Sequence, residues 1–348
     1  MSFYLATIAV YFVVYATGAL GLNLQFGLGG IVNFGFIVFE AAGAYAAALT
    51  SVGSSATGAA QSETYFWGTS LPFPVPLILA GVVGGLLALV IGPATMRKMR
   101  RDYQAAAMLS FALIANQVVG NTAGFLNGGN GIANVPAPLR SLGGLSLSSY
   151  HWVYVGWAFL LGIVIFVVCR WISYSPFGRT IRMLRDDEEA ASSLGVNAWT
   201  VRMRLFVVGG VIAGLTGGLL VEFIGAWSPG AWSYQETFVL LQAVILGGVG
   251  SEYGAVFGAL IVGVILFQLP TFLPPIGYPG LIDSLQWIVI GFVYLMVLWF
   301  APQGTFRERA TLKLGSRSRR RAPNNLARDI GVGPPTVTAT ASDIHEEA

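Results

Sequence analysis

The sequence predicts an all-α protein that crosses a membrane several times, and three observations lead to this fold class. The chain has 348 residues, of which 55% are hydrophobic and only 10% are charged. A water-soluble domain usually contains about 25% charged residues, so most of this chain must lie in an apolar environment. The hydrophobic residues also gather in long, nearly uncharged runs, which is typical of membrane-spanning helices.

Nine apolar runs follow one another along the chain, and seven of them are long enough to cross a membrane as a helix. The run at 237–250 is short and ends in a glycine-rich sequence. Together with the run after it, it is interpreted either as two crossings or as a re-entrant pair. We therefore expect about eight to nine transmembrane segments, arranged as nine crossings or as seven crossings plus a re-entrant pair. The runs lie at about 4–26, 31–52, 74–96, 104–122, 151–173, 205–225, 237–250, 255–273 and 281–300.

Lysine and arginine residues predict the orientation, because cytoplasmic segments of membrane proteins are enriched in them. They gather near 97–101, around 170–204 and in 307–328, whereas the loops of the other side contribute only Arg140. An odd number of crossings that starts outside places all three clusters in the cytoplasm. We therefore predict an outside N-terminus, an inside C-terminus, a membrane domain over residues 1–305, and a disordered basic cytoplasmic tail over 306–348. This distribution indicates topology and not nucleic-acid binding.

A charged stretch at 175–195 is exceptional in such an apolar chain. Pro176 and Gly178 are expected to end the preceding span, and residues 179–194 are expected to form one short amphipathic helix. Gly195 is expected to end this helix in a left-handed conformation. A short helix with a stop on either side is suited to press into a groove of a partner protein. Its apolar side is predicted to contain Ile181, Leu184 and Ala191.

Polar residues inside the apolar runs form the second candidate site. Glu40 is the deepest charge, and Asn23, Asn33 and Asn116 are the accompanying amides. A charge at mid-bilayer costs at least about 2.5–3.5 kcal/mol, so such residues face protein or water and not lipid. They are interpreted either as the lining of a translocation path or as a buried hydrogen-bond network that holds broken helices together.

Several kinds of chemistry are excluded by composition. The two lysines, Lys98 and Lys313, do not follow a glycine, so the chain has no Walker A phosphate-binding loop. Cys169, His151 and His345 are too few and too scattered for a metal centre. No catalytic constellation is present, so neither a metal nor another cofactor is expected, and a lipid-modifying membrane enzyme is disfavoured.

Several segments together resemble the permeases of the branched-chain amino acid ABC importers, especially their LivM-type subunits. The resemblance covers roughly residues 15–305. The segments that carry it are ALGLNL at 19–24, GIVNFG at 30–35, AGAY at 42–45, RDY at 101–103, NGGNGI at 127–132, SPFGR at 175–179, EAA at 189–191 with Gly195, LGGVGS at 246–251 and FAPQG at 300–304.

The resemblance implies a function and a set of partners. Residues 1–305 would be the permease domain, and residues 174–204 its cytoplasmic coupling loop. The partners would be a second, LivH-like permease subunit, two cytoplasmic ATP-binding subunits and an extracytoplasmic substrate-binding protein, all at a bacterial plasma (inner) membrane and its lipid. The residues of the loop that would couple it to the ATPase are Arg179, Arg182, Glu189, Ala190, Ala191 and Gly195.

Two other functions stay open for the sequence. One is an ABC permease for urea, short amides or another small polar metabolite, built on the same fold. The other is an ion-coupled secondary transporter that uses Glu40 as its ion site. The EAA-xxx-G spacing disfavours the second, because a transporter driven by an ion gradient has no need of a coupling loop.

Overall fold

The computed structural model of the chain describes residues 2–52, 68–96, 101–138, 147–272, 281–300 and 304–306. Within these residues the structure is helical, and the β-type pairing is limited to one bridge between Ile132 and Trp227. The all-α prediction is therefore confirmed for the described part of the chain. These residues belong to one compact unit, Met1–Glu308, and nearly all of the predicted tail, residues 307–348, lies outside the described residues.

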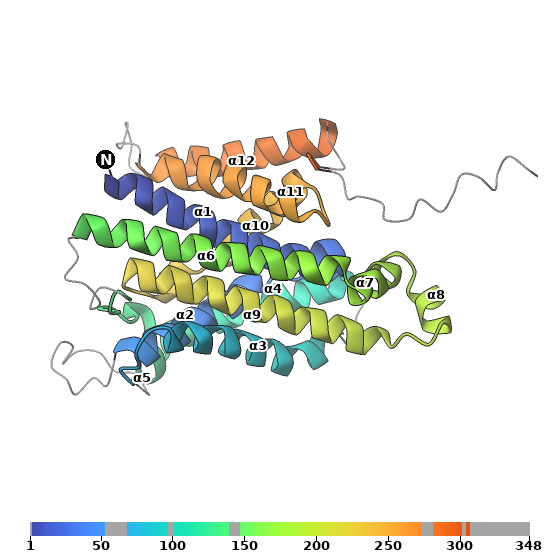
Figure 1. Ribbon diagram of the computed structural model, residues 1–348, viewed down its shortest axis with the longest axis horizontal. Helices are drawn as coiled ribbons and strands as arrows, with labels where there is room; N and C mark the ends of the chain where they lie inside the picture. The colour runs from blue at the N-terminus through green and yellow to red at the C-terminus, as the bar shows by residue number, and fades with distance from the viewer. Residues whose placement is uncertain are drawn as a thin grey trace, which may run out of the picture. The chain divides into compact units, whose positions relative to one another are not determined.

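Each of the nine apolar runs forms a helix or a stack of helical segments (Figure 1). The long helices are α1 (Ser2–Leu22), α2 (Phe36–Val52), α3 (Val75–Met96), α4 (Arg101–Asn121), α6 (Leu147–Tyr174), α9 (Ala198–Ile224) and α12 (Leu281–Phe300). The shorter ones are α5 (Ala123–Leu126), α7 (Pro176–Asp186), α8 (Glu188–Ser193), α10 (Tyr234–Gly247) and α11 (Glu252–Gly258). Two π-helical segments, η1 (Asn23–Leu28) and η6 (Ala259–Gln268), extend α1 and α11, and the 3-10 turns are η3 (Gly128–Asn130), η5 (Pro229–Ala231) and η7 (Leu269–Phe272).

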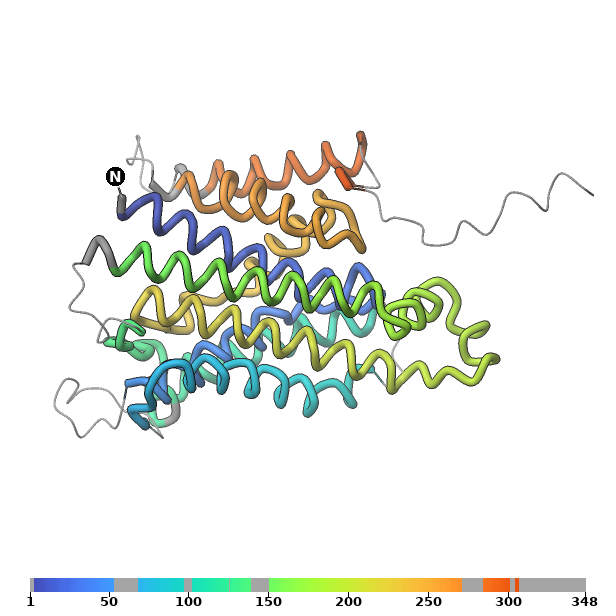
Figure 2. Tube along the Cα trace, in the orientation of Figure 1, coloured from blue at the N-terminus to red at the C-terminus, as the bar shows by residue number. Residues whose placement is uncertain are grey.

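Helix length and composition make this a multi-pass membrane protein. Four helices among the described residues are long and apolar enough to cross a membrane: Phe3–Leu28, Val75–Met96, Tyr150–Tyr174 and Ala198–Ile224. Three further apolar helices are shorter: Phe36–Val52, Glu252–Gln268 and Ser284–Phe300. The long helices run in roughly the same direction across the bundle in the orientation that the two figures share (Figures 1 and 2).

Glycine residues bring the backbones of α2, α3 and α9 close together. A Cβ atom built on Gly43 of α2 would lie 2.3 Å from the carbonyl oxygen of Gly214 in α9. A Cβ on Gly214 would in turn lie 2.2 Å from the carbonyl oxygen of Ala80 in α3. These backbones therefore touch directly, as small residues permit in membrane helix packing.

The short run at 237–250 and the run after it form a tight helical pair, α10 and α11. A Cβ on Gly247 would lie 1.8 Å from the carbonyl oxygen of Gly254. Gly248 and Gly250 make the connecting turn with φ angles of 118° and 83°, which side chains disfavour. At about 1.5 Å per residue, the 14 residues of α10 extend for roughly 21 Å, less than the ~30 Å hydrocarbon core.

One end of the bundle collects segments that are far apart in sequence. Arg185 of α7 donates from Nη1 to the carbonyl oxygen of Gly27 in η1. Asn23 of η1 accepts from the Gly250 amide at 2.9 Å. Phe306 donates to the carbonyl oxygen of Gly247 at 2.8 Å. This end is where α7 and α8 extend from the long helices (Figure 2).

Candidate functional site

The projection formed by α7 and α8 begins at a sharp turn after α6. Ser175 caps α7 by accepting from the Gly178 amide at 3.2 Å, and Pro176 occupies the first turn. A Cβ on Gly178 would lie 2.4 Å from the carbonyl oxygen of Ile172, so only glycine fits between α6 and α7. Arg182 clamps the turn by donating to the carbonyl oxygen of Ser173 at 2.9 Å. The predicted end of the preceding span at this point is confirmed.

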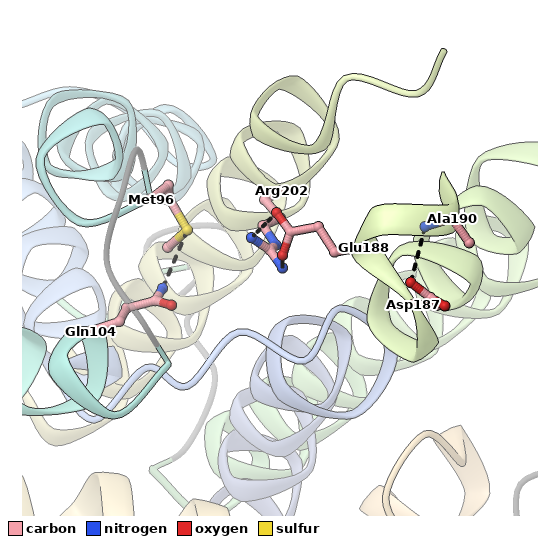
Figure 3. Close-up of polar contacts among 6 residues, drawn as sticks. All are labelled: Met96, Gln104, Asp187, Glu188, Ala190 and Arg202. Atoms are coloured by element: carbon pink, nitrogen blue, oxygen red, sulfur yellow. Dashed lines mark hydrogen bonds and ion pairs between the residues drawn. The ribbon is translucent and has the colours of Figure 1, made fainter. Parts of the chain in front are cut away.

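The prediction of one continuous helix over 179–194 is wrong, because the chain breaks at Asp187. This residue has extended backbone angles, and its Oδ1 atom accepts from the Ala190 amide at 3.0 Å (Figure 3). It thereby caps α8, and two acidic residues in the first turn of α8 favour a helix start at this place. The preference of aspartate for the cap position outweighs the continuous periodicity of the segment.

An ion pair ties α8 to the start of α9. The Arg202 guanidinium donates to both carboxylate oxygens of Glu188, from Nη1 at 3.1 Å and from Nη2 at 2.7 Å (Figure 3). Gly195 ends the segment with φ of 83°, so the predicted left-handed stop is confirmed. The cap of Asn197 on the Thr200 amide then opens α9. The projection is therefore held at its start, its middle and its end.

The predicted coupling residues divide between an inner and an outer side of the projection. Ala191 is fully buried, together with the predicted apolar residues Ile181 and Leu184. Arg179, Glu189, Ala190 and Gly195 are exposed. Leu194 is 74% exposed, although it is apolar and belongs to a short helical turn. Sequence reasoning missed Leu194, for which the only signal was a large apolar residue immediately before the stop glycine.

The amides predicted for the translocation path bond to protein groups. Asn23 accepts from Gly250, and Asn33 donates to Gln25 Oε1 at 2.8 Å. Asn116 donates to the carbonyl oxygens of Pro229 and Trp232 at 2.9 and 2.8 Å. These contacts anchor the π-helical turn and the segment after α9, as the network interpretation expects.

Glu40 is placed differently from the three amides. It is 3% exposed, and it has no hydrogen bond or ion pair with any described residue. It lies in the wall of a cavity of about 350 Å³ between α1, α2, α9, α10 and η6. Glu236, from the first turn of α10, also lines the cavity. It was not among the predicted site residues, because it lies just before the predicted apolar run at 237–250.

The rest of the cavity wall is aromatic and aliphatic. Its aromatic residues are Tyr11, Tyr15, Trp227 and Phe267, and its aliphatic ones include Val14, Leu220, Ile224 and Leu240. A volume of this size is at the lower end for small-molecule sites. Among the described residues no group of His, Cys, Asp and Glu is arranged to hold a metal ion. The cavity has room for a small molecule.

A multi-pass helical bundle with a cavity and a capped helical projection at one end is the arrangement expected of a membrane transport protein. The chain belongs to the family described as branched-chain amino acid transport system / permease component, whose model matches residues 4–298.

Named relatives agree with this family. The chain is similar to the high-affinity branched-chain amino acid transport system permease protein LivM of Salmonella typhimurium, with 27% identity over 331 residues, or 89% of this chain and 72% of that protein. The probable LivM permease of Methanocaldococcus jannaschii is 23% identical over 88% of this chain and 94% of its own length. A segment of 95 residues is 40% identical to LivH of Salmonella typhimurium, covering 27% of this chain and 30% of that protein. No solved structure matches the chain.

Proposed function

We propose that this chain is one of two permease subunits of an ATP-driven importer that carries branched-chain amino acids across a bacterial plasma membrane. The observation that carries the proposal is the α7–α8 projection within a chain of this permease family. The related LivM and LivH proteins are named as permease proteins of branched-chain amino acid transport systems.

The membrane topology in this proposal has nine crossings, with the N-terminus outside. The stack of α11, η6 and η7 spans 21 residues, Glu252–Phe272, which at about 1.5 Å per residue is long enough for a crossing. The shorter α10 is continued on its other side by residues 225–233, which Asn116 of α4 anchors inside the bundle. Two crossings are therefore favoured over a re-entrant pair.

The exposed side of the projection is the proposed contact with a cytoplasmic ATPase subunit. Glu189, Ala190, Leu194 and Gly195 form its tip, where an apolar side chain is surrounded by small and charged ones. The buried side of the projection packs against the bundle. A movement of the ATPase subunit against the tip would therefore shift α7 as a unit. Switching of this kind, between two packed arrangements, is a general mechanism of conformational change.

Arg185 extends this route into the membrane. Its hydrogen bond to Gly27 joins α7 to η1. The Asn23–Gly250 bond then joins η1 to the turn between α10 and α11. Because α1 and α10 also supply cavity residues, a movement of the projection reaches the cavity through two helices.

The second permease subunit is proposed to cover α4. Ser110, Gln117 and Asn121 are exposed on this helix at spacings of seven and four residues, so they share one face. Polar side chains inside membranes usually face protein or water, so this face is unsuited to lipid. A LivH-like subunit there, and an extracytoplasmic binding protein above both, complete the proposed importer.

Reconstitution tests the proposal. The chain would be purified with its permease partner and two ATPase subunits, placed in proteoliposomes, and supplied with the binding protein. Uptake of radiolabelled leucine that requires ATP is expected, and Gly195→Val or Glu189→Lys should abolish it while membrane insertion persists. Uptake that follows an ion gradient without ATP would contradict the proposal. Stronger competition by urea or acetamide than by isoleucine would favour the alternative cargo.

A further inference from the structure

We propose that the cavity between α1, α2 and α10 binds the ammonium group of an amphipathic amine through Glu40 and Glu236. This inference rests on the proposed function and names the part of the cargo that the permease itself recognises. It concerns one subunit's interior, separate from the face of α4 assigned to the second permease.

The two carboxyl groups lack a partner among the residues that the structure describes. Glu40 is 3% exposed and lines the cavity, and neither it nor Glu236 makes a side-chain hydrogen bond or ion pair with a described residue. Taking a carboxylate out of water costs several kcal/mol unless an opposite charge or hydrogen-bond donors compensate. None of the described lining residues is Lys, Arg or His, so a bound cation would supply the missing charge.

The backbone that presents Glu40 is held in place. A Cβ on Gly217 of α9 would lie 1.9 Å from the carbonyl oxygen of Glu40, so α9 packs directly against this residue. Glu236 lies beside Thr237, whose hydroxyl accepts from the Ile37 amide at 3.1 Å and ties α10 to α2. The backbone at both residues is therefore held beside one cavity before a ligand enters.

The remaining wall favours an organic cation over a bare metal ion. Tyr11, Tyr15 and Phe267 line the cavity, and aromatic rings attract cations. Leu220 and Leu240 add aliphatic surface that suits a branched hydrocarbon chain. The volume of about 350 Å³ is roughly ten times the ~30 Å³ that a water molecule occupies. An inorganic cation would leave most of this apolar wall without contact.

The charge of the cavity is measured with a cysteine reporter that does not depend on transport. Ala231 lines the cavity, and the chain's single cysteine, Cys169, is buried elsewhere and is replaced by alanine. Ala231→Cys in the reconstituted complex is labelled with a trimethylammonium and a sulfonate methanethiosulfonate reagent, and both rates are normalised to a free thiol. The cationic reagent is expected to react at least about tenfold faster, since a charged cleft raises the local concentration of counter-ions by this factor or more.

Matched variants assign the preference to the two carboxyl groups. The double variant Glu40→Gln with Glu236→Gln should bring the ratio near one, whereas Glu40→Asp should retain it. Glu222→Gln is the control, because Glu222 is equally buried in α9 but lies two residues from the cavity-lining Leu220 and Ile224, on the opposite side of the helix. Equal labelling rates in the parent, or loss of the preference in the control alone, would overturn the inference.

Ligand protection then identifies the cation. Leucine and 3-methylbutylamine, which is leucine without its carboxyl group, should each slow labelling about tenfold at about ten times their Kd. 4-Methylpentanoate, which is leucine without its ammonium group, should not protect the cysteine from labelling. Exchanging the buffer cation from N-methylglucamine to sodium should not protect it either. Protection by sodium, or by 4-methylpentanoate as well as by the amine, would refute the assignment. ATP-driven leucine uptake in the same vesicles tests the proposed function separately. If the vesicles import leucine but the cysteine shows no preference for the cationic reagent, this inference is refuted and the proposed function is not.

Discussion

Gly217 lies where two central helices touch, and its replacement by alanine is a sharp test of the packing. A Cβ atom there would lie 1.9 Å from the carbonyl oxygen of Glu40 and 2.7 Å from its carbonyl carbon. Ordinary contacts of this kind begin at 3.4 Å, so α2 and α9 would have to separate by about 1.5 Å. Both atoms belong to backbone, so no side-chain rotation relieves the clash.

The expected cost follows from this geometry. Overpacking a well-packed interior costs about 1–3 kcal/mol, and a backbone clash belongs at the upper end of that range. Alanine recovers up to about 1 kcal/mol of helix propensity. The free energy of unfolding should therefore fall by about 2 kcal/mol, and the thermal midpoint by roughly 4–8 °C.

The matched control is Gly156→Ala. Gly156 lies in α6, is exposed, and would have nothing within 4 Å of an added Cβ. The thermal midpoint of the Gly156→Ala variant should stay the same or rise by roughly 2–4 °C, because alanine adds helix propensity without a clash. Both variants would be heated in one detergent at one scan rate and followed by tryptophan fluorescence, since unfolding of large proteins is often irreversible. Equal midpoints for the two variants would refute the direct contact between α2 and α9.

Three further predictions concern coupling and topology. Arg185→Ala should reduce ATP-driven uptake by about tenfold or more, because a hydrogen bond from a charged group contributes about 1.5–3 kcal/mol. Thr180→Ala on the same helix is the control and should leave uptake unchanged. Equal uptake in both variants would argue against the route through Gly27. Leu194→Asp should weaken co-purification of the chain with the ATPase subunit. It should not lower the thermal midpoint, since the Leu194 side chain is 74% exposed and contributes little to the fold. Undiminished co-purification would exclude Leu194 from the contact with the ATPase. A reporter fused after Ala348 should be cytoplasmic, and an extracytoplasmic signal would overturn the predicted orientation.

The helices were predictable because their signal is local. Each apolar run forms helix since a backbone in lipid must satisfy its own hydrogen bonds, and the sequence alone shows approximately where such runs lie. Ser175 with Pro176, and Gly195 at the other end, mark the projection through their own backbone preferences. The break at Asp187 was missed because the amphipathic pattern continues through it, although its cap is also a local interaction.

The candidate site was predictable only in part. Sequence reasoning grouped Glu40 with Asn23, Asn33 and Asn116, since all four are polar residues in apolar runs. Their difference depends on distant partners: the Gly250 amide is 227 positions from Asn23. Glu236 was not among the predicted site residues, because no nearby residue signals that α10 begins early enough to turn it toward the cavity.

By itself, the sequence determined that this protein is a helical membrane permease with a capped projection, which the predicted topology places on the cytoplasmic side. Length, hydrophobicity and capping act over a few residues, so they can be read without coordinates. Only the tertiary structure decided which polar groups bond to protein and which face a cavity. That distinction depends on close backbone contacts such as Gly217 against Glu40, which bring helices from distant parts of the chain around one space.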